Sequence, residues 1–339
     1  MAMRVWSTRE ACARDFGDAW KARLAGSPLA HYAMRLDLLE WQARHGEHAL
    51  ALLVDDPLPG AIVLRETRLG WACGWPWRWQ ALVEGDETLA GLSTEQAGAL
   101  ASAAERAVPG KRLEFFAPEA SAAGWPGFKA GTTVMLPLTE PEESLWKRLD
   151  KTKQSSIKRA TRDGFSVAVA DRPEQFRAFR RLQLETDARR DGGEAAPEEA
   201  SPAPGEAWRE WELPWQWLLV AERDGVVEAG SGFGVGEGGT IDYRTNASSI
   251  AGKKSGCNFM LAWEAIRRGR ERGCRRMNWG GATRFKRDMG GEMVPIWCGL
   301  GGGAAWRLPN EVSASIRRAR PRVAAWWRKL RETPEGKTR

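Results

Sequence analysis

The nine residues Arg284-Phe285-Lys286-Arg287-Asp288-Met289-Gly290-Gly291-Glu292 are the most informative stretch of this chain. They follow a segment with the pattern of a strand, residues 275–279, and a Gly280-Gly281 pair. Before that strand, a helical pattern runs from about Asn258 to Arg272 and ends at Gly273, the residue type that commonly follows a helix. The order is therefore helix, strand, glycine break and a short glycine-bounded turn that carries Phe285 and Lys286.

This order resembles the C-terminal half of the Fem family, whose members are aminoacyl-tRNA-dependent peptidyltransferases built from two GNAT-like (N-acetyltransferase-like) subdomains. The resemblance covers residues 138–300 well, and residues 1–139 only through the order of their elements. It implies an α/β (α+β) fold with two GNAT-like subdomains, each a mixed, mostly antiparallel sheet flanked by helices. It divides the chain into 1–139, 140–302 and a basic C-terminal helical tail, 303–339.

The residues from 139 to 248 predict the first elements of the second subdomain. Thr139-Glu140-Pro141-Glu142 has the form of a capping box, and apolar residues at helical spacing extend this helix to Gly164. A strand at 165–170 and a helix at 173–189 follow, and then a Gly-, Ala-, Pro- and Glu-rich stretch, 191–205, predicts a flexible acidic loop. Three strands complete this run at 217–222, 226–235 and 240–247, with Asp224-Gly225 as a hairpin turn. A three-stranded meander, a crossover helix and one more strand form the core of a GNAT fold.

The first 139 residues show a similar order more faintly. They predict helices at 10–24, 31–44 and 94–107 and strands at 49–54, 61–65, 112–117 and 132–138. No internal sequence similarity is visible, so the duplication is implied by the family resemblance rather than by the pattern.

Composition excludes several classes of protein. No apolar run approaches the ~20 residues that span a bilayer, and the N-terminal residues lack a signal-peptide pattern. Five widely spaced cysteines without a Cys-x-x-Cys pair indicate reduced thiols in a cytoplasmic protein. His45-Gly46-Glu47-His48 has too few companions for a ligand set, so we expect no metal. The net charge of +7 lies in residues 303–339, with ten Lys/Arg against three Glu.

Lys286 is the candidate catalytic residue, with Phe285 beside it. Aminolysis of an ester passes through an oxyanion, and a fixed cation aimed at that oxygen is the largest single aid to the reaction. By resemblance, the Phe-Lys pair contacts the 3′ end of the tRNA and the reacting ester, and Phe285 stacks on the terminal adenosine. The family often has Phe-Gly-Gly-Glu after the lysine, and Met289 replaces that phenylalanine here. The alternative from the residues alone is a solvated basic turn.

Cations elsewhere predict a surface for tRNA, and a solvated helix face is the alternative interpretation of those in residues 147–162. Residues 147–162 carry seven cations against one acid, and Ile157-Lys158-Arg159-Ala160 is similar to the Ile-Arg-Lys-Ala end of a helix in the family. Lys253-Lys254-Ser255-Gly256-Cys257-Asn258 occupies the position of the loop that cradles pyrophosphate in acetyl-CoA-using GNAT enzymes, but it departs from that motif at both ends. Asn258 is then expected to be a plain helix N-cap. The predicted tRNA-binding residues are Lys158, Arg159, Lys253, Lys254, Arg284 and Arg287.

The predicted acceptor site lies between the subdomains. Trp71, Trp75, Trp77 and Trp79 alternate with Pro76 and Arg78, and their position matches a part of the first subdomain that lines the acceptor cleft in Fem-like proteins. Trp75, Trp77, Arg78 and, by resemblance, Tyr243 are the predicted acceptor-binding residues. Tryptophans of an ordinary core are the alternative interpretation.

The sequence therefore predicts a monomeric cytoplasmic aminoacyltransferase. By resemblance, it moves an aminoacyl group from a charged tRNA to an amine and forms an amide bond without a covalent enzyme intermediate or a cofactor. The acceptor is a cell-wall precursor, a peptide-like molecule or a natural-product intermediate. The alternatives are a GNAT N-acyltransferase that uses acetyl-CoA and a non-catalytic RNA-binding protein.

Overall fold

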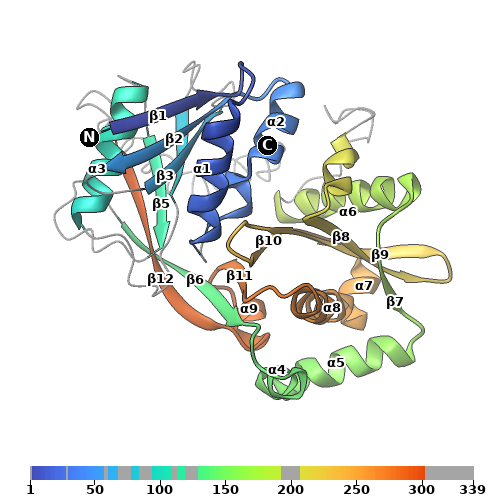
Figure 1. Ribbon diagram of the computed structural model, residues 1–339. Helices are drawn as coiled ribbons and strands as arrows, with labels where there is room; N and C mark the ends of the chain where they lie inside the picture. Colours follow the sequence, from blue (N-terminus) through green and yellow to red (C-terminus); the bar gives the residue numbers. More distant parts are fainter. Residues whose placement is uncertain are drawn as a thin grey trace, which may run out of the picture.

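The computed structural model describes residues 2–27, 30–56, 60–67, 78–83, 94–108, 113–118, 129–191 and 207–301. These residues form one 12-stranded sheet in the order β1-β2-β3-β4-β5-β12-β6-β11-β10-β9-β8-β7 (Figure 1). Its strands are β1 (Ala2–Ser7), β2 (Ala49–Asp56), β3 (Gly60–Thr67), β4 (Arg78–Val83), β5 (Leu113–Pro118), β6 (Lys129–Pro137), β7 (Ser166–Val169), β8 (Gln216–Arg223), β9 (Val226–Val235), β10 (Thr240–Ser248), β11 (Arg276–Gly281) and β12 (Glu292–Gly301).

Helices flank this sheet. They are α1 (Arg14–Ala25), α2 (Leu36–Arg44), α3 (Thr94–Ala107), α4 (Glu142–Arg148), α5 (Lys151–Arg162), α6 (Pro173–Asp191), α7 (Ile250–Ser255), α8 (Cys257–Glu271) and α9 (Arg284–Asp288), with 3₁₀ turns η1 (Tyr32–Met34) and η4 (Ala207–Glu212). In the described part of the chain, no helix is both long enough and apolar enough to span a membrane.

The two halves of the sheet repeat one plan. Strands β1 to β4 are antiparallel, and α3 then crosses to β5, which is parallel to β4. Strands β7 to β10 are likewise antiparallel, and α7 and α8 cross to β11, which is parallel to β10. This arrangement confirms the predicted fold class, a mixed and mostly antiparallel sheet built from two GNAT-like units.

The last strand of each half, β6 or β12, pairs with strands of the other half where the two halves of the sheet meet. β6 pairs with β11, and β12 lies between β5 and β6. The chain therefore passes from α9 directly into the sheet of the first half. The division at residue 139 stays a prediction, but the strand order shows that neither half is complete without the other's strand.

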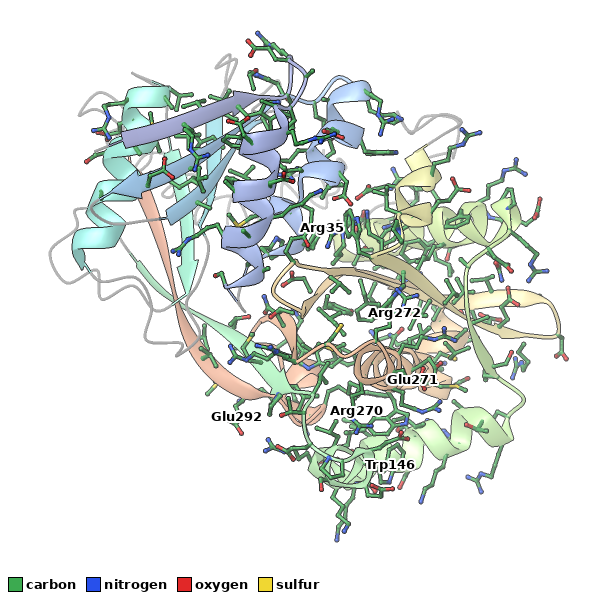
Figure 2. The ribbon with its side chains drawn as sticks, in the orientation of Figure 1. Arg35, Trp146, Arg270, Glu271, Arg272 and Glu292 are labelled. Atoms are coloured by element: carbon green, nitrogen blue, oxygen red, sulfur yellow. The ribbon has the colours of Figure 1, made fainter. Side chains whose placement is uncertain are left out.

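Residues 30–37 of the first half dock onto the second half. The indole Nε1 of Trp215 donates a hydrogen bond of 2.6 Å to Asp37. Arg35, labelled in Figure 2, pairs with Glu237 at 3.2 Å and covers the Trp215 ring at 4.9 Å. These contacts set the position of η1 against β9 and β10.

Three glycines of β9 let aromatic rings pack closely on the sheet, and one of these rings, that of Tyr32, belongs to the docked segment. A Cβ atom on any of these glycines would overlap an aromatic ring packed on the sheet, so no larger residue fits. The three pairs are Gly230 with Phe179, Gly232 with Trp211, and Gly234 with Tyr32.

Several local predictions need correction. The helix predicted from Thr139 to Gly164 is two helices, because Asp150 accepts the Thr152 N–H (2.8 Å) and starts α5 anew. The predicted capping box is wrong, since Pro141 is the N-cap of α4 and makes no side-chain cap bond. β1, β4 and β12 were not predicted. The Asp224-Gly225 turn is confirmed by positive φ values of 54° and 77°.

Candidate active site

The site lies where β10 and β11 diverge. These strands pair only at Thr240–Arg276, Ile241–Met277 and Asp242–Asn278, although β10 continues to Ser248. Tyr243 is the first residue of β10 beyond the last pair. α9 follows β11 and brings the Nζ of Lys286 to 5.3 Å from the centroid of the Tyr243 ring. The structure thus places Tyr243, which was predicted to bind the acceptor, next to Phe285 and Lys286, which were predicted to be catalytic.

The ammonium group of Lys286 is half-buried and has no counter-ion in the described part of the chain. Burial lowers the pKa of Lys286, and no carboxylate contributes to that shift. Its Nζ lies against Gly280, where a Cβ atom would be only 3.3 Å from it. Gly280 has a φ of 71°, a conformation that glycine adopts without strain. An unpaired, partly desolvated cation is well suited to a charge that develops during a reaction.

Phe285 and Asp288 hold α9 in place. The Phe285 ring packs with Phe259 (5.2 Å between centroids), Tyr243 (6.4 Å) and Trp279 (6.4 Å). At the other end, the carbonyl of Asp288 accepts the Asp150 N–H (3.0 Å) and its carboxylate pairs with Lys153 (3.3 Å). The ring therefore anchors α9, and its stacking on a tRNA base stays a prediction.

A polar network that the sequence did not reveal continues along β10. Asn246 donates to the Ser231 hydroxyl (2.7 Å) and to the Asn258 side-chain oxygen (3.2 Å). Burial raises the pKa of Tyr243, opposed by its hydrogen bond with Ser231, so the phenol is neutral. A β-bulge explains this arrangement. Tyr243 pairs with Phe233 and Thr245 with Gly232, which leaves Arg244 as the extra residue and turns Asn246 to the side of Tyr243.

The predicted loop from Lys253 to Asn258 is wrong. Ser249 accepts the Gly252 N–H (2.9 Å) and caps α7, which ends at Gly256 with φ 90° before α8 begins at Cys257. Asn258 is therefore not an N-cap, and its amide donates to Ser248 at 3.3 Å.

Helix α5 crosses over the start of α8. A Cβ atom at Gly256 would lie 3.0 Å from the Cβ and 3.1 Å from the carbonyl oxygen of Ser156. α5 thus packs directly against Gly256, at the helix start where CoA-using enzymes cradle a pyrophosphate.

The predicted tRNA-binding side chains lie on three neighbouring helices. Lys158 and Arg159 are exposed on α5, and Arg159 donates to the carbonyl of Lys254 at 2.9 Å, which joins α5 to α7. The Lys158 ammonium lies 6.0 Å from the ring of Trp146, labelled in Figure 2. The other four predicted tRNA-binding residues are also exposed: Lys253 and Lys254 on α7, and Arg284 and Arg287 on α9.

The rest of the predicted acceptor site is not described. Trp71, Trp75 and Trp77 lie outside the described residues, and for Arg78 and Trp79 only the backbone, in β4, is described. The acidic loop from residue 192 and the tail 303–339 also lie outside them.

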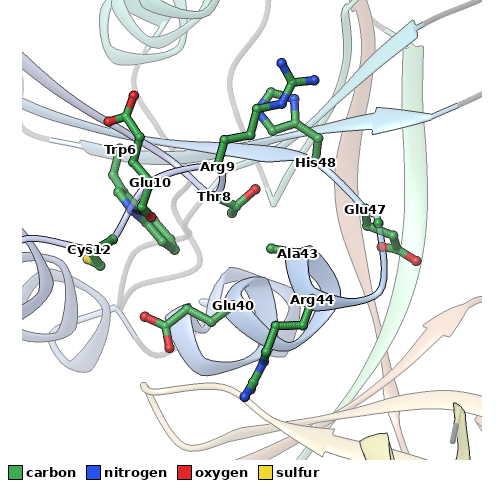
Figure 3. A pocket seen from close by; sticks show the side chains of 12 residues that line it. Trp6, Thr8, Arg9, Glu10, Cys12, Glu40, Ala43, Arg44, Glu47 and His48 are labelled. Carbon is green, nitrogen blue, oxygen red and sulfur yellow. Dashed lines mark hydrogen bonds between the residues drawn. The ribbon is translucent and has the colours of Figure 1, made fainter.

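A cavity of about 660 Å³ lies elsewhere, in the first half between the β1–α1 turn and α2 (Figure 3). Its lining includes Trp6, Arg9, Glu40 and Arg44 but none of the predicted site residues. His48, also in the lining, is hydrogen-bonded to Ser7 at 3.2 Å. Within the described ranges, no group of three or more His, Cys, Asp or Glu side chains could hold a metal ion.

Comparisons with known proteins agree with this architecture. Residues 147–287, less than half of the chain, match the family model described as an acetyltransferase (GNAT) domain. The crystal structure of FemX is similar over 88% of this chain and 97% of its own, with a TM-score of 0.61 and 12% identity.

Two further solved structures are similar. The C-terminal domain of a putative lysylphosphatidylglycerol synthetase from Agrobacterium fabrum matches 88% of this chain and 97% of its own, with a TM-score of 0.53 and 16% identity. A conserved protein of unknown function from Bacteroides thetaiotaomicron matches 86% and 99%, with a TM-score of 0.50 and 12% identity. No curated protein matches the sequence. The chain thus has a Fem-like tandem GNAT fold, the fold of acyltransferases.

Proposed function

We propose that this protein transfers an aminoacyl group from a charged tRNA to an amine acceptor. The observation that carries the proposal is the half-buried Lys286 ammonium, without a counter-ion among the described residues, at the divergence of β10 and β11. The Fem-like fold supports it, because the Phe285-Lys286 pair that resembles the family's Phe-Lys pair lies in a chain that also has a Fem-like fold.

Lys286 would act on the oxygen of the reacting ester. The acceptor amine attacks the ester carbonyl, and the negative charge that forms on its oxygen is stabilised by the Lys286 ammonium. The C–N bond forms in this attack, and the C–O bond to the tRNA ribose then breaks as the oxyanion collapses. The proton lost by the amine ends on the released ribose hydroxyl, directly or through water. No side chain becomes acylated, so no nucleophilic Ser or Cys is required.

Charged tRNA is favoured over acetyl-CoA as the donor by two features. α5 packs against Gly256, at the helix start where a pyrophosphate would bind, and this leaves little room for a CoA donor there. Exposed cations lie instead on the neighbouring helices α5, α7 and α9, and they suit contacts with a phosphate backbone. The match of residues 147–287 to an acetyltransferase domain keeps acetyl-CoA as the second candidate donor.

The acceptor remains defined only as an amine. A cell-wall precursor, a peptide-like molecule and a natural-product intermediate all carry one. The name of one similar structure, a putative lysylphosphatidylglycerol synthetase, adds a lipid to the acceptors to be tested, with transfer to its hydroxyl in place of an amine.

A transfer assay with a mixed pool of labelled aminoacyl-tRNAs tests the proposal. Label should move to the acceptor in a ribonuclease-sensitive manner, and Lys286→Met should slow the transfer by about 10²–10³, the usual cost of one oxyanion donor. Lys21→Met, an exposed lysine on α1, is the matched control and should change nothing. Turnover that survives Lys286→Met would exclude the assigned role. Micromolar binding of acetyl-CoA in calorimetry, with no transfer from tRNA, would favour the acyl-CoA enzyme, and tRNA binding without transfer would favour an RNA-binding protein.

A further inference from the structure

A buried carboxylate connects the two halves of the molecule at the base of the site. Asp242 is the last residue of β10 that pairs with β11, and its side chain is only 4% exposed. One oxygen accepts the backbone N–H of Tyr32, from the first half, at 3.0 Å. The other oxygen accepts the Asn278 amide of β11 at 2.9 Å, and His31 Nε2 lies 3.7 Å from it.

Asn278 links Asp242 to the backbone of Gly280. Its side-chain oxygen accepts both the Gly280 N–H (2.9 Å) and the Thr133 hydroxyl of β6 (2.6 Å). Gly280 is the glycine against which the Lys286 ammonium lies, at 3.3 Å from the position of a Cβ atom. An unbroken chain of contacts therefore leads from Tyr32 through Asp242, Asn278 and Gly280 to Lys286.

The carboxylate also determines which way the Asn278 amide faces. Burial raises the pKa of Asp242, but both of its oxygens accept hydrogen bonds here, one from Tyr32 and one from Asn278. The NH₂ group of Asn278 therefore faces Asp242, and its oxygen faces Gly280 and Thr133. With an amide at position 242, Asn278 is free to flip and to present its NH₂ group to the Gly280 N–H, donor against donor. A polar group left buried and unpaired in this way destabilises the turn that contains Gly280.

We propose that Asp242 and Asn278 are positioning residues that hold the Gly280 backbone, and with it the Lys286 ammonium, in place when η1 of the first half is docked. The proposal rests on the assigned role of Lys286. It adds that the reaction centre in the second half is set by a contact from the first half, so a catalytic function requires both halves.

An exchange of the two side chains tests this proposal. Asp242→Asn and Asn278→Asp each place like groups opposite each other, two donors in the first variant and two carboxylates in the second. The double variant restores the pattern with the two groups in exchanged positions. The new amide at position 242 accepts from the Tyr32 N–H and donates to the new carboxylate at position 278, which in turn accepts from Gly280 and Thr133.

Two measurements follow each variant. Hydrogen exchange of the peptide covering residues 280–286 should become at least ten times faster in each single variant, relative to a peptide from β8 and β9. It should return to within threefold of the wild-type rate in the double variant. Transfer should follow the same order, through kcat rather than the KM for tRNA. Asp171→Asn, which alters an exposed carboxylate just before α6 and outside the docked segment, is the matched control and should leave both measurements within twofold.

The outcomes separate this proposal from the proposed function. The positioning role is overturned if the hydrogen-exchange rate of residues 280–286 is unchanged in the single variants, or if it does not return toward the wild-type rate in the double variant. This holds whatever the transfer assay gives. Absence of transfer in the wild-type protein removes the proposed function, while the exchange data still decide whether Asp242 and Asn278 hold the turn. Equal loss in Asp171→Asn would also overturn it, because the loss would then not depend on the contact between Asp242 and Asn278.

Discussion

Replacing Gly280 by alanine tests how closely Lys286 depends on its surroundings. The new Cβ atom would lie 3.3 Å from the Lys286 Nζ, a distance shorter than a comfortable carbon–nitrogen contact. The lysine side chain is flexible, so the ammonium group should move by about half an ångström. An alanine at φ 71° is also strained, by roughly 1–2 kcal/mol, and lower entropy of the unfolded chain offsets about 0.4–1 kcal/mol of that.

The two consequences differ in size. For a cation moved from about 2.9 to 3.4 Å from an oxyanion, Coulomb's law at an effective dielectric constant of 20 gives a loss of about 0.8 kcal/mol, or about fourfold in rate. Complete loss of the hydrogen bond raises this to about 10²-fold. Net destabilisation of about 1 kcal/mol should lower the melting temperature by only about 2–4 °C.

Gly281→Ala is the matched control, because no atom lies within 4 Å of its Cβ position and its φ is not positive. Single-turnover transfer from charged tRNA and thermal melting should be measured for both variants. We expect a fourfold to hundredfold loss of rate for Gly280→Ala and almost none for Gly281→Ala. Equal rates in the two variants would refute the argument that Gly280 sets the position of the ammonium group.

Three further predictions follow from the same geometry. Because burial lowers the pKa of Lys286, its charge and the activity it supports should be lost as the pH rises through a value below the ~10.4 of an ordinary lysine. In pH–rate profiles, Lys286→Arg should move the loss of activity to a higher pH, because a guanidinium keeps its charge there. Loss at the same pH in both proteins would contradict this. Gly232→Ala should destabilise the fold by about 1–3 kcal/mol in denaturant titrations, because its Cβ would be 2.8 Å or less from atoms of the Trp211 ring. Lys158→Met should reduce the slope of log Kd for tRNA against log salt by about 0.7–0.9, and an unchanged slope would remove Lys158 from the interface.

Local patterns predicted much of the second half. The hairpin at Asp224-Gly225 follows from two residue types that tolerate positive φ, and β8, β9 and β10 lie where their residue patterns placed them. The segment that carries Lys286 was predicted as a turn bounded by glycines, and in the structure it forms the short helix α9 between Gly281 and Gly290. These features depend on neighbours in the chain, which a sequence shows directly.

The amino-acid sequence by itself therefore determined most of the order of elements in the second half, the basic character of α5 and the presence of a glycine-bounded lysine after β11. Only the tertiary structure decided the pairing of β6 and β12 with strands of the other half, the packing of α5 against Gly256 and the bulge at Arg244 that turns Asn246 toward Tyr243. It also decided that Asp242 meets Tyr32 across more than 200 positions of the chain. The physical reason is that strand register and docking are set by the packing of segments far apart in the sequence. A local residue pattern does not specify which distant segment a strand will contact.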